Sequence, residues 1–315
     1  MKLVTYEGSN GLALGVIHGD VVVDVAGALD WGGLLPKPEA ALRAAVERLE
    51  AAGGPPLDTI DLIGRGREYL AALGRVVAAA GSASPPEPGL LTPLAGVRLR
   101  APIARPPKIT CLGLNYADHA REQGKEPPKI PVFFQKSSHT VIGPGDPIRL
   151  PVNSNENDCE AELTVVIGRG GSRIPVERAW EHVAGYTILN DVSARDMQRD
   201  DRQWWRGKSC DTFAPAGPWI VTPDEIPDPH ALAISLTLNG KIMQQSNTSN
   251  LIHRIDYLIS YLSQSLTWET GDLIATGTPG GVGVFRKPPI FIKAGDEVSV
   301  TVEGIGTLTN PVAAP

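Results

Sequence analysis

The chain has 315 residues, of which 42% are apolar and 20% are charged. These proportions are typical of globular proteins and exclude a disordered chain or a coiled coil. The formal net charge of −6 opposes nucleic acid or an anionic membrane as the main partner, because both attract basic surfaces. We therefore expect a compact protein that binds a small molecule.

The 34 glycines and 28 prolines favour short strands and tight turns over long helices. No apolar run approaches the ~20 residues of a membrane span, and the first residues contain no signal-like apolar stretch. The three cysteines form no Cys-x-x-Cys pair, so they predict neither a disulfide framework nor a structural zinc site. These features favour a location in the cytoplasm.

Residues 1–95 predict a small N-terminal region that contains both strands and helices. Short apolar runs separated by turns predict a β meander; the runs are 3–6, 12–17 and 21–25. Two amphipathic patterns then predict helices; their apolar faces hold Leu42, Val46 and Leu49 in the first and Tyr69, Leu70, Leu73 and Val77 in the second. Residues 78–93 are rich in Pro and Gly and predict a linker, which sets the domain boundary near residue 95.

Residues 96–315 predict a larger, β-rich domain. Its apolar runs predict a series of closely spaced strands; these are 109–114, 132–136, 163–168, 185–189, 219–222, 272–276 and 297–302. Asn239 and Gly240 lie between two further runs and predict a hairpin, since both central positions of a type I′ turn need positive φ. Residues 251–265 predict the one long helix of this domain.

Three carboxylates form the first candidate site. Glu160 and Glu162 begin a predicted strand, whose two-residue period puts both side chains on one face, about 7 Å apart. Asp191 follows a second predicted strand and offers a third carboxylate. Carboxylates without cysteine or histidine suit a hard cation such as Mg²⁺ or Mn²⁺. A solvated face of an antiparallel strand is the alternative explanation of the same spacing.

His119 and Glu122 form the second candidate site. They are three residues apart, so their side chains adjoin if this segment is helical. A carboxylate beside an imidazole raises its basicity and fixes its tautomer, which predicts a pair able to deprotonate water. An ordinary ion pair on a helix surface is the alternative. The polar, proline-broken residues 123–129 predict a mobile loop with the composition of a lid.

Residues 199–209 mix basic and aromatic side chains and contain the letters GKS. A P-loop needs glycine where Arg202 stands, and Asp200 and Asp201 oppose a nucleic-acid patch, so we exclude both. Lys208 is a candidate for contacting a carboxylate or an oxyanion, with an ordinary surface lysine as the alternative.

The glycine-rich residues 275–283 follow a predicted strand but open no helix, which opposes a dinucleotide site. Their backbone N–H groups and the Thr278 hydroxyl are able to meet an anionic ligand.

Taken together, these segments resemble the fumarylacetoacetate hydrolase superfamily from about residue 107 to residue 312. Eight motifs occur in the order found in that family: GLNYADHARE, VIGPGDPIRLP, CEAELTVVIG, AGYTILNDVSARDMQ, QWWRGKSCDTFAPAGPWIVT, LTLNGKIMQQSNTSNLI, GDLIATGTPGGVGVF and EGIGTLTNP. The resemblance implies a β-rich α+β fold, namely the mixed β-sandwich roll of that family with a small α+β region at the N-terminus. It also implies a homodimer.

The resemblance assigns a role to each candidate residue. It implies that Glu160, Glu162 and Asp191 bind the metal, Mg²⁺ or Mn²⁺. It implies catalytic roles for His119, Glu122 and Lys208, and substrate contacts for Arg195, Gln198 and Thr278. The chain departs from the family pattern near the pocket, with Cys159 and Cys210 in place of common aromatic residues and with Gln135 and Ser137 around Lys136 where Leu and Pro are usual.

The expected reaction follows from the chemistry of the implied ligands. A divalent cation that chelates a 2-oxo acid stabilises the enolate formed when the adjacent carbon–carbon bond breaks. We therefore expect a hydrolase that cleaves a 2,4-dioxo acid of the acylpyruvate type. The alternatives are a decarboxylase of oxaloacetate or another 2-oxo acid, a 2-hydroxyhepta-2,4-diene-1,7-dioate isomerase, and a metal-dependent binding protein without turnover.

Overall fold

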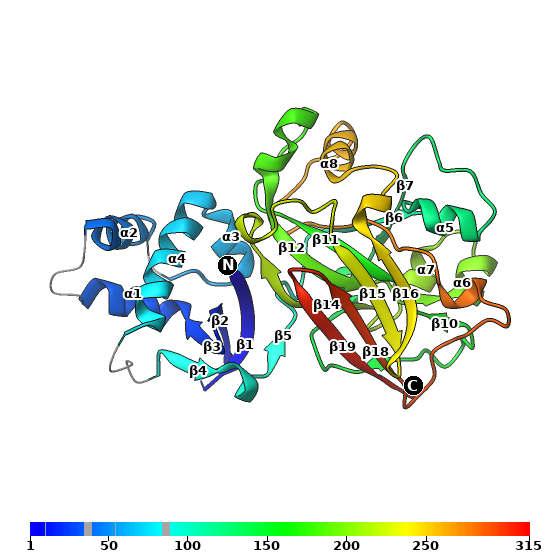
Figure 1. Ribbon diagram of the computed structural model, residues 1–315, viewed down its shortest axis with the longest axis horizontal. Helices are drawn as coiled ribbons and strands as arrows, with labels where there is room; N and C mark the ends of the chain where they lie inside the picture. Colours follow the sequence, from blue (N-terminus) through cyan, green and yellow to red (C-terminus); the bar gives the residue numbers. More distant parts are fainter. Residues whose placement is uncertain (10, 35–39, 54, 84–88) are drawn as a thin grey trace.

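The computed structural model describes residues 1–9, 11–34, 40–53, 55–83 and 89–315. It has a β-rich α+β fold, as expected, in which two sheets pack together and the N-terminal elements lie at one end of the molecule (Figure 1). The helices are α1 (Val25–Leu34), α2 (Ala40–Ala51), α3 (Thr59–Gly64), α4 (Arg67–Gly81), α5 (Ala117–Glu122), α6 (Arg195–Asp200), α7 (Trp205–Lys208) and α8 (Ile255–Ser263).

The larger sheet has twelve strands and runs through both regions of the chain. Its main path has the order β4-β3-β2-β1-β14-β12-β11-β17-β6-β7, with β5 beside β1 and β8 beside β14. These strands are β1 (Lys2–Gly8), β2 (Gly11–His18), β3 (Val21–Asp24), β4 (Leu91–Pro93), β5 (Leu99–Arg100), β6 (Ile109–Gly113), β7 (Val132–Lys136), β8 (Val141–Ile142), β11 (Ala161–Ile167), β12 (Val183–Asn190), β14 (Ala214–Val221) and β17 (Leu273–Ala275).

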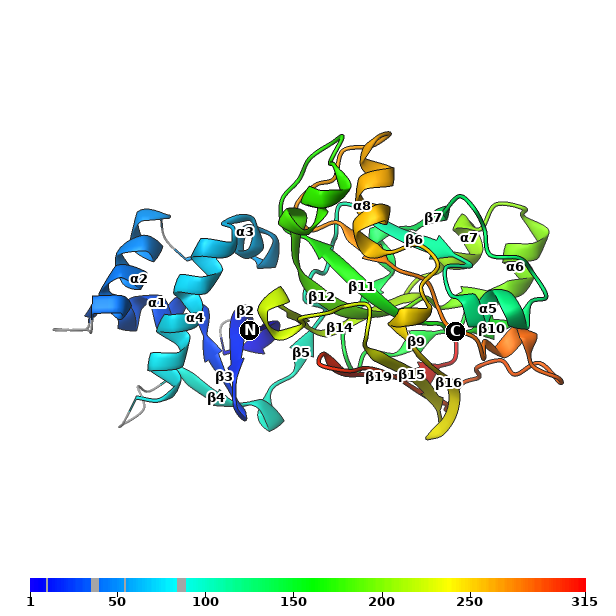
Figure 2. The ribbon, with the colours of Figure 1, turned by 45° about the horizontal axis from the view of Figure 1, so that its top comes forward.

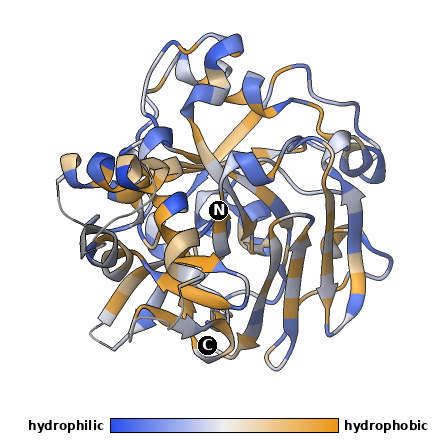
Figure 3. Cartoon of the chain, turned by 60° about the vertical axis from the view of Figure 1, so that its left-hand side comes forward, coloured by the Kyte–Doolittle hydropathy of each residue, from blue (hydrophilic) through white to orange (hydrophobic). Residues whose placement is uncertain are grey.

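The smaller sheet has five strands in the order β16-β15-β18-β19-β9. They are β9 (Ile148–Arg149), β15 (Ala233–Leu238), β16 (Lys241–Asn247), β18 (Glu297–Val302) and β19 (Gly306–Ala313). A separate short pair consists of β10 (Asn157–Asp158) and β13 (Ser193–Ala194). Apolar and hydrophilic residues alternate along the strands in Figure 3, as the two-residue period of a sheet with one buried face requires.

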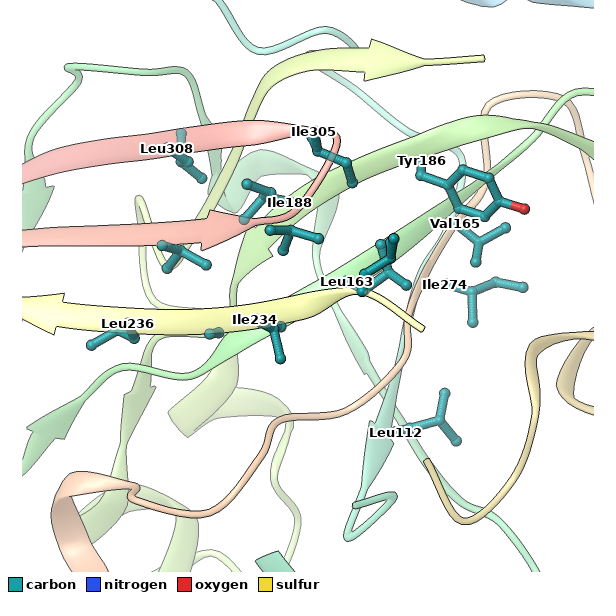
Figure 4. Close-up of a cluster of buried hydrophobic side chains, with 14 of the residues drawn as sticks. Leu112, Leu163, Val165, Tyr186, Ile188, Ile234, Leu236, Ile274, Ile305 and Leu308 are labelled. Carbon is teal, nitrogen blue, oxygen red and sulfur yellow. The ribbon is translucent and has the colours of Figure 1, made fainter. Parts of the chain in front are cut away.

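The main core lies between the two sheets (Figure 4). Leu163 and Ile188 of the larger sheet face Ile234 and Leu308 of the smaller one, and all four side chains are buried. Burying a side chain of this size contributes about 1.5–3 kcal/mol, so this layer fixes the relative position of the sheets. The sheets therefore hold the start of β11 and the end of β12 rigidly, where the candidate carboxylates lie.

The N-terminal region has the predicted meander and both predicted helices. Strands β1, β2 and β3 pair in antiparallel register, and α2 and α4 bury the apolar faces that their sequences indicated. Backbone hydrogen bonds also cross the proposed boundary near residue 95, because β1 pairs with both β5 and β14. The division into residues 1–95 and 96–315 stays a prediction.

The predicted linker over residues 78–93 is wrong at both of its ends. Helix α4 continues to Gly81, because Val77 and Ala80 pack into the N-terminal core. Residues Leu91–Pro93 form β4 on the edge of the larger sheet beside β3. Residues 84–88 in the middle lie outside the described part of the chain.

Other elements also differ from expectation, and α8, β19 and α1 show the reasons. Helix α8 begins at Ile255, four residues later than predicted, because Leu251 and Ile252 make bridging contacts with the segment around Asn115. Strand β19 was not expected, since its run TLTNP contains Pro311; the strand tolerates it in the antiparallel pair with β18. Helix α1 was not expected either, because the strand pattern of β3 leads into it without a break.

The hairpin prediction is confirmed. Strands β15 and β16 are antiparallel, and Asn239 and Gly240 between them have φ of 51° and 75°. Within the described residues no helix is long and apolar enough to cross a membrane.

Candidate active site and metal centre

Strand register explains how three carboxylates that are distant in sequence meet. Strands β11 and β12 are antiparallel with Ala161 opposite Asn190, and the backbone N–H of Asp191 donates to the carbonyl of Glu160. Glu162 is the second residue of β11 and lies on the same side. Each of the three side chains offers a carboxylate oxygen, and these oxygens all lie within 4.8 Å of one another.

The burial of these carboxylates rules out the solvated strand face that their spacing also allowed. Glu160 is 5% exposed, Glu162 is 1% exposed and Asp191 is fully buried. Buried carboxylates are costly unless cations or hydrogen bonds compensate them. The surrounding residues must therefore supply positive charge.

Three basic side chains surround the carboxylates. The Lys208 ammonium donates to both Glu160 Oε2 and Asp191 Oδ2 at 2.6 Å, and Lys136 Nζ donates to Asp191 Oδ1 at 2.6 Å. Arg195 donates to Glu160 Oε1 at 2.5 Å and to Asp158 Oδ2 at 3.2 Å. All three cations are buried. Lys208 is thus not the surface lysine that its position also allowed.

These contacts set the charge states around Glu160. Burial by itself would raise the pKa of Glu160, but the charges of Arg195 and Lys208 outweigh burial and hold that pKa well below its ordinary value of 4.5. Burial would likewise lower the pKa of Lys208, but Asp191 and Glu160 raise it above its ordinary value of 10.5. Glu160 therefore stays ionised and Lys208 stays charged at neutral pH.

Glu162 differs from its two neighbours because no basic side chain in the described ranges forms an ion pair with it. Its Oε2 accepts only the backbone N–H of Gly277, at 2.9 Å. Burial raises the pKa of Glu162 well above its ordinary value of 4.5, and the charges of Asp191 and Glu160 raise it further. This carboxylate lacks a cation.

The donor set fits a hard divalent ion. It consists of oxygen ligands only, from three buried carboxylates. Four buried carboxyl groups, counting Asp158, face three buried cations, Lys136, Arg195 and Lys208. These groups therefore carry a net charge of −1 when all four carboxyl groups are ionised. Glu162 is the carboxylate that a further cation would neutralise.

His119 and Glu122 lie on α5, and their side chains meet as the spacing predicted. His119 Nδ1 is 2.8 Å from Glu122 Oε1, so Nδ1 carries the proton and donates to the carboxylate. The other carboxylate oxygen accepts the backbone N–H of Gly281 at 2.7 Å. His119 is 5% exposed, and the Phe285 ring packs edge-on against its imidazole. The pair is thus held from two sides, unlike an ion pair on a helix surface.

The second imidazole nitrogen is the one available for chemistry. His119 Nε2 accepts a hydrogen bond from Gln123 Nε2 at 2.8 Å. Gln123 therefore covers the basic lone pair in this arrangement, and a substrate must displace its amide to reach that nitrogen.

A cavity of about 630 Å³ joins the two sites. Its lining includes His119, Glu160, Lys208 and all three expected substrate-contact residues, Arg195, Gln198 and Thr278. Gln198 Oε1 accepts from Arg195 at 3.0 Å, and Thr278 Oγ1 accepts from Gln244 Nε2 at 2.8 Å. Leu112, Phe134, Trp204 and Phe285 supply apolar walls. Figures 1 and 2 show α5, α6 and α7 at the end of the molecule away from the N-terminal region.

The structure adds residues that the sequence interpretation did not select. Lys136 ends β7 and neutralises Asp191; Asp158 accepts from Arg195 and from the backbone N–H groups of Gly283 and Val284. Asp158 continues the two-residue spacing of Glu160 and Glu162, so a signal for it was present. Gln123 carried no such signal, because its role depends on how the chain turns after α5.

Comparisons with known proteins agree with the family resemblance of the sequence motifs. Residues 108–313 match the family model described as fumarylacetoacetate (FAA) hydrolase C-terminal. Over 222 residues the chain is 50% identical to the oxaloacetate tautomerase FAHD2A, mitochondrial, of Bos taurus; the match covers 70% of this chain and 71% of that protein.

Two solved structures are similar over the whole chain. One is the 5-carboxymethyl-2-hydroxymuconate delta-isomerase of Mycobacterium smegmatis, with 38% identity, a TM-score of 0.72 and coverage of 100% of this chain and 99% of that one. The other is the maleylpyruvate hydrolase of Sphingobium sp. SYK-6 in complex with manganese (II) ion and pyruvate, with 30% identity, a TM-score of 0.73 and coverage of 100% and 99%. The named relatives therefore comprise a tautomerase, an isomerase and a hydrolase.

Proposed function

We propose that this chain, which belongs to the fumarylacetoacetate hydrolase family of enzymes, interconverts the keto and enol forms of oxaloacetate in a reaction that depends on Mg²⁺ or Mn²⁺. The observation that carries the proposal is the single cavity in which a basic histidine, oriented by Glu122, shares space with the Glu160 carboxylate. Tautomerisation needs a base and a way to stabilise an enolate; the histidine is the base, and a divalent cation held by Glu160 would stabilise the enolate.

Glu160, Glu162 and Asp191 would hold the metal. When bound, the ion withdraws electron density from the carbonyl and carboxylate of a 2-oxo acid and so makes the neighbouring C–H bond more acidic. His119 Nε2 removes the proton from C3, and Glu122 stabilises the imidazolium that forms. Thr278 and Gln198 bind the substrate from the cavity wall, and the apolar walls exclude water. The proton is returned at the carbonyl oxygen, which gives the enol.

Hydrolysis of a 2,4-dioxo acid, the reaction expected from the sequence, is the second candidate. The similarity to a hydrolase structure that holds manganese and pyruvate favours it. In that reaction His119 would deprotonate a water molecule instead of a carbon acid, and Gln198 would stabilise the oxyanion. The two reactions need the same base and differ in what it deprotonates.

One experiment separates these reactions. The purified protein with Mg²⁺ is mixed with enol oxaloacetate, and the ultraviolet absorbance of the enol is followed while pyruvate is measured with lactate dehydrogenase and NADH. We expect the enol signal to decay faster than in buffer without formation of pyruvate. Pyruvate from oxaloacetate would instead show a decarboxylase, and pyruvate from acetylpyruvate without tautomerisation would show a hydrolase. Binding without any turnover would support the binding-protein alternative.

We also propose that the protein forms a homodimer and that it is located in the cytoplasm. Both proposals are independent of the proposed reaction. Size-exclusion chromatography with light scattering tests the first, and fractionation of the source cells tests the second. The Bos taurus relative carries the word mitochondrial in its name.

Gly281 offers a test of how the histidine is oriented. It has φ of +100°, and a Cβ at this position would lie 2.2 Å from the carbonyl oxygen of Met243. Gly281→Ala should therefore shift the backbone N–H that holds Glu122, lower kcat by about tenfold or more and cost about 1–3 kcal/mol of unfolding free energy. Assays of the rate and urea unfolding measure both effects.

Gly280→Ala is the matched control for this variant. Its φ lies outside the left-handed region, and its added Cβ would come no closer than 3.3 Å to the Asp118 carbonyl oxygen and 3.6 Å to the His119 backbone nitrogen. Gly280→Ala is expected to lower kcat and the free energy of unfolding less than Gly281→Ala does. Equal kcat for Gly281→Ala and the unaltered enzyme would contradict the orienting role of Gly281.

A further inference from the structure

The cations that line the active-site cavity are not equivalent. Arg195 contacts Asp158 and Glu160, Lys208 contacts Glu160 and Asp191, and Arg199 contacts Glu156. Lys125 lines the same cavity, yet across the described ranges its ammonium has no acidic partner. Within the described residues, the side-chain hydrogen bond of Lys125 runs from Nζ to Gln123 Oε1, at 2.8 Å.

Backbone hydrogen bonds at the end of α5 fix the position of the Lys125 main chain. Helix α5 ends in a Schellman turn, in which Gly124 has φ of +63°, its N–H donates to the Arg121 carbonyl, and the Lys125 N–H donates to the Ala120 carbonyl. The following loop is held by His253, whose Nε2 donates to the Pro128 carbonyl. These hydrogen bonds fix the Lys125 backbone beside the cavity, and its exposed side chain lines the cavity mouth.

Lys125 also lies close to the reacting atoms. Gln123 accepts from Lys125 through Oε1 and donates through Nε2 to His119 Nε2. The ammonium is thus two hydrogen bonds and one amide group away from the basic nitrogen. A group attached to the carbon that His119 deprotonates would come within reach of both Gln123 and Lys125.

We infer that Lys125 binds the distal carboxylate of the substrate and so makes the enzyme selective for 2-oxo dicarboxylates over 2-oxo acids with a neutral side chain. The inference rests on the proposed function, because His119 must act on the carbon that carries that second carboxylate. In oxaloacetate this is C3, to which the C4 carboxylate is attached. An ammonium without an acidic partner binds a carboxylate more strongly than it binds a neutral carbonyl, because the carboxylate adds charge attraction to the hydrogen bond.

The test compares oxaloacetate with its C4 methyl ester, which lacks only the distal charge. We expect Lys125→Met to lower kcat/KM for oxaloacetate by about tenfold, mainly through KM, and to leave kcat/KM for the ester nearly unchanged. Lys125→Arg should keep most of the activity on oxaloacetate. Lys129→Met, which changes an exposed lysine of the same loop that does not line the cavity, should resemble the unaltered enzyme on both substrates.

A different pattern would overturn the inference. If Lys125 merely orients Gln123 toward His119, Lys125→Met will lower the rates of both substrates to the same extent. If Lys125 is an ordinary solvent-exposed lysine, neither rate will change.

Failure of the proposed function is recognised separately, because the unaltered enzyme would then tautomerise neither compound. Calorimetric titration of oxaloacetate and of the ester into the Mg²⁺-loaded protein decides the inference in that case. About tenfold weaker binding of oxaloacetate to Lys125→Met, with equal binding of the ester, supports it. Equal binding of oxaloacetate to both proteins contradicts it.

Discussion

Replacing Glu162 with glutamine is expected to abolish Mg²⁺-dependent turnover while leaving the metal-free protein almost as stable as before. Glu162 is buried and forms no ion pair with any described residue, and its raised pKa favours the protonated carboxyl group in the metal-free protein. Glutamine has nearly the shape of the protonated side chain, so the free energy of unfolding should change by no more than about 1 kcal/mol. Turnover is lost because an amide cannot neutralise a divalent ion.

Glu160→Gln should behave in the opposite way in the metal-free protein. Glu160 accepts hydrogen bonds from both Arg195 and Lys208, and its removal leaves two buried cations short of a counter-charge. Breaking a buried pair by removing one partner costs about 3–5 kcal/mol. Both variants should be inactive, but only Glu160→Gln should be strongly destabilised.

Thermal and urea unfolding with and without Mg²⁺ distinguish the two carboxylates. A ligand present at a hundred times its Kd stabilises a protein by about 2.7 kcal/mol, so the unaltered enzyme should gain stability from the ion, whereas Glu162→Gln should gain almost none. A Glu162→Gln protein that still gains this stability, or still turns over substrate after treatment with a chelator, would refute the assignment of Glu162 to the metal.

Local sequence signals were sufficient for most of the fold. Apolar runs identified β11 and β12, the Asn239–Gly240 pair identified the hairpin, and the apolar face identified α4. Errors arose where tertiary packing overrides composition. The alanine-rich end of α4 resembles a linker in isolation, and only its contact with the N-terminal core shows that it is helical.

The site was predictable to the extent that its residues lie at regular spacings. Glu160 directly precedes β11 and Glu162 is the second residue of that strand, and His119 and Glu122 share a helical turn. The ion pair between Asp191 and Lys136 could not be predicted from spacing along the sequence, because it depends on the order of strands in the sheet. The resemblance to a family pointed to most of the site, whereas Lys136 and Gln123 required coordinates and Asp158 was missed although its spacing indicated it.

His119→Ala is expected to lower kcat by about 10²–10⁴, the usual effect of losing a general base, while metal affinity stays nearly unchanged. The imidazole contacts Glu122, Gln123 and Phe285 and makes no hydrogen bond to the three carboxylates. Calorimetric titration with Mn²⁺ should therefore give the same Kd for the variant and the unaltered enzyme. His139→Ala is the matched control, since this histidine is 46% exposed and pairs with Asp211 away from the cavity.

Glu122→Gln should show that the two residues act as a unit. An amide at this position keeps a hydrogen-bond acceptor for His119 Nδ1 but does not stabilise the imidazolium, so we expect kcat to fall by roughly 10- to 100-fold. Adding this change to His119→Ala should cost almost nothing more, because without the base Glu122 has no charge to stabilise. If the losses in kcat of the two single variants multiply in the double variant, Glu122 has a separate role in the reaction and the dyad does not describe it.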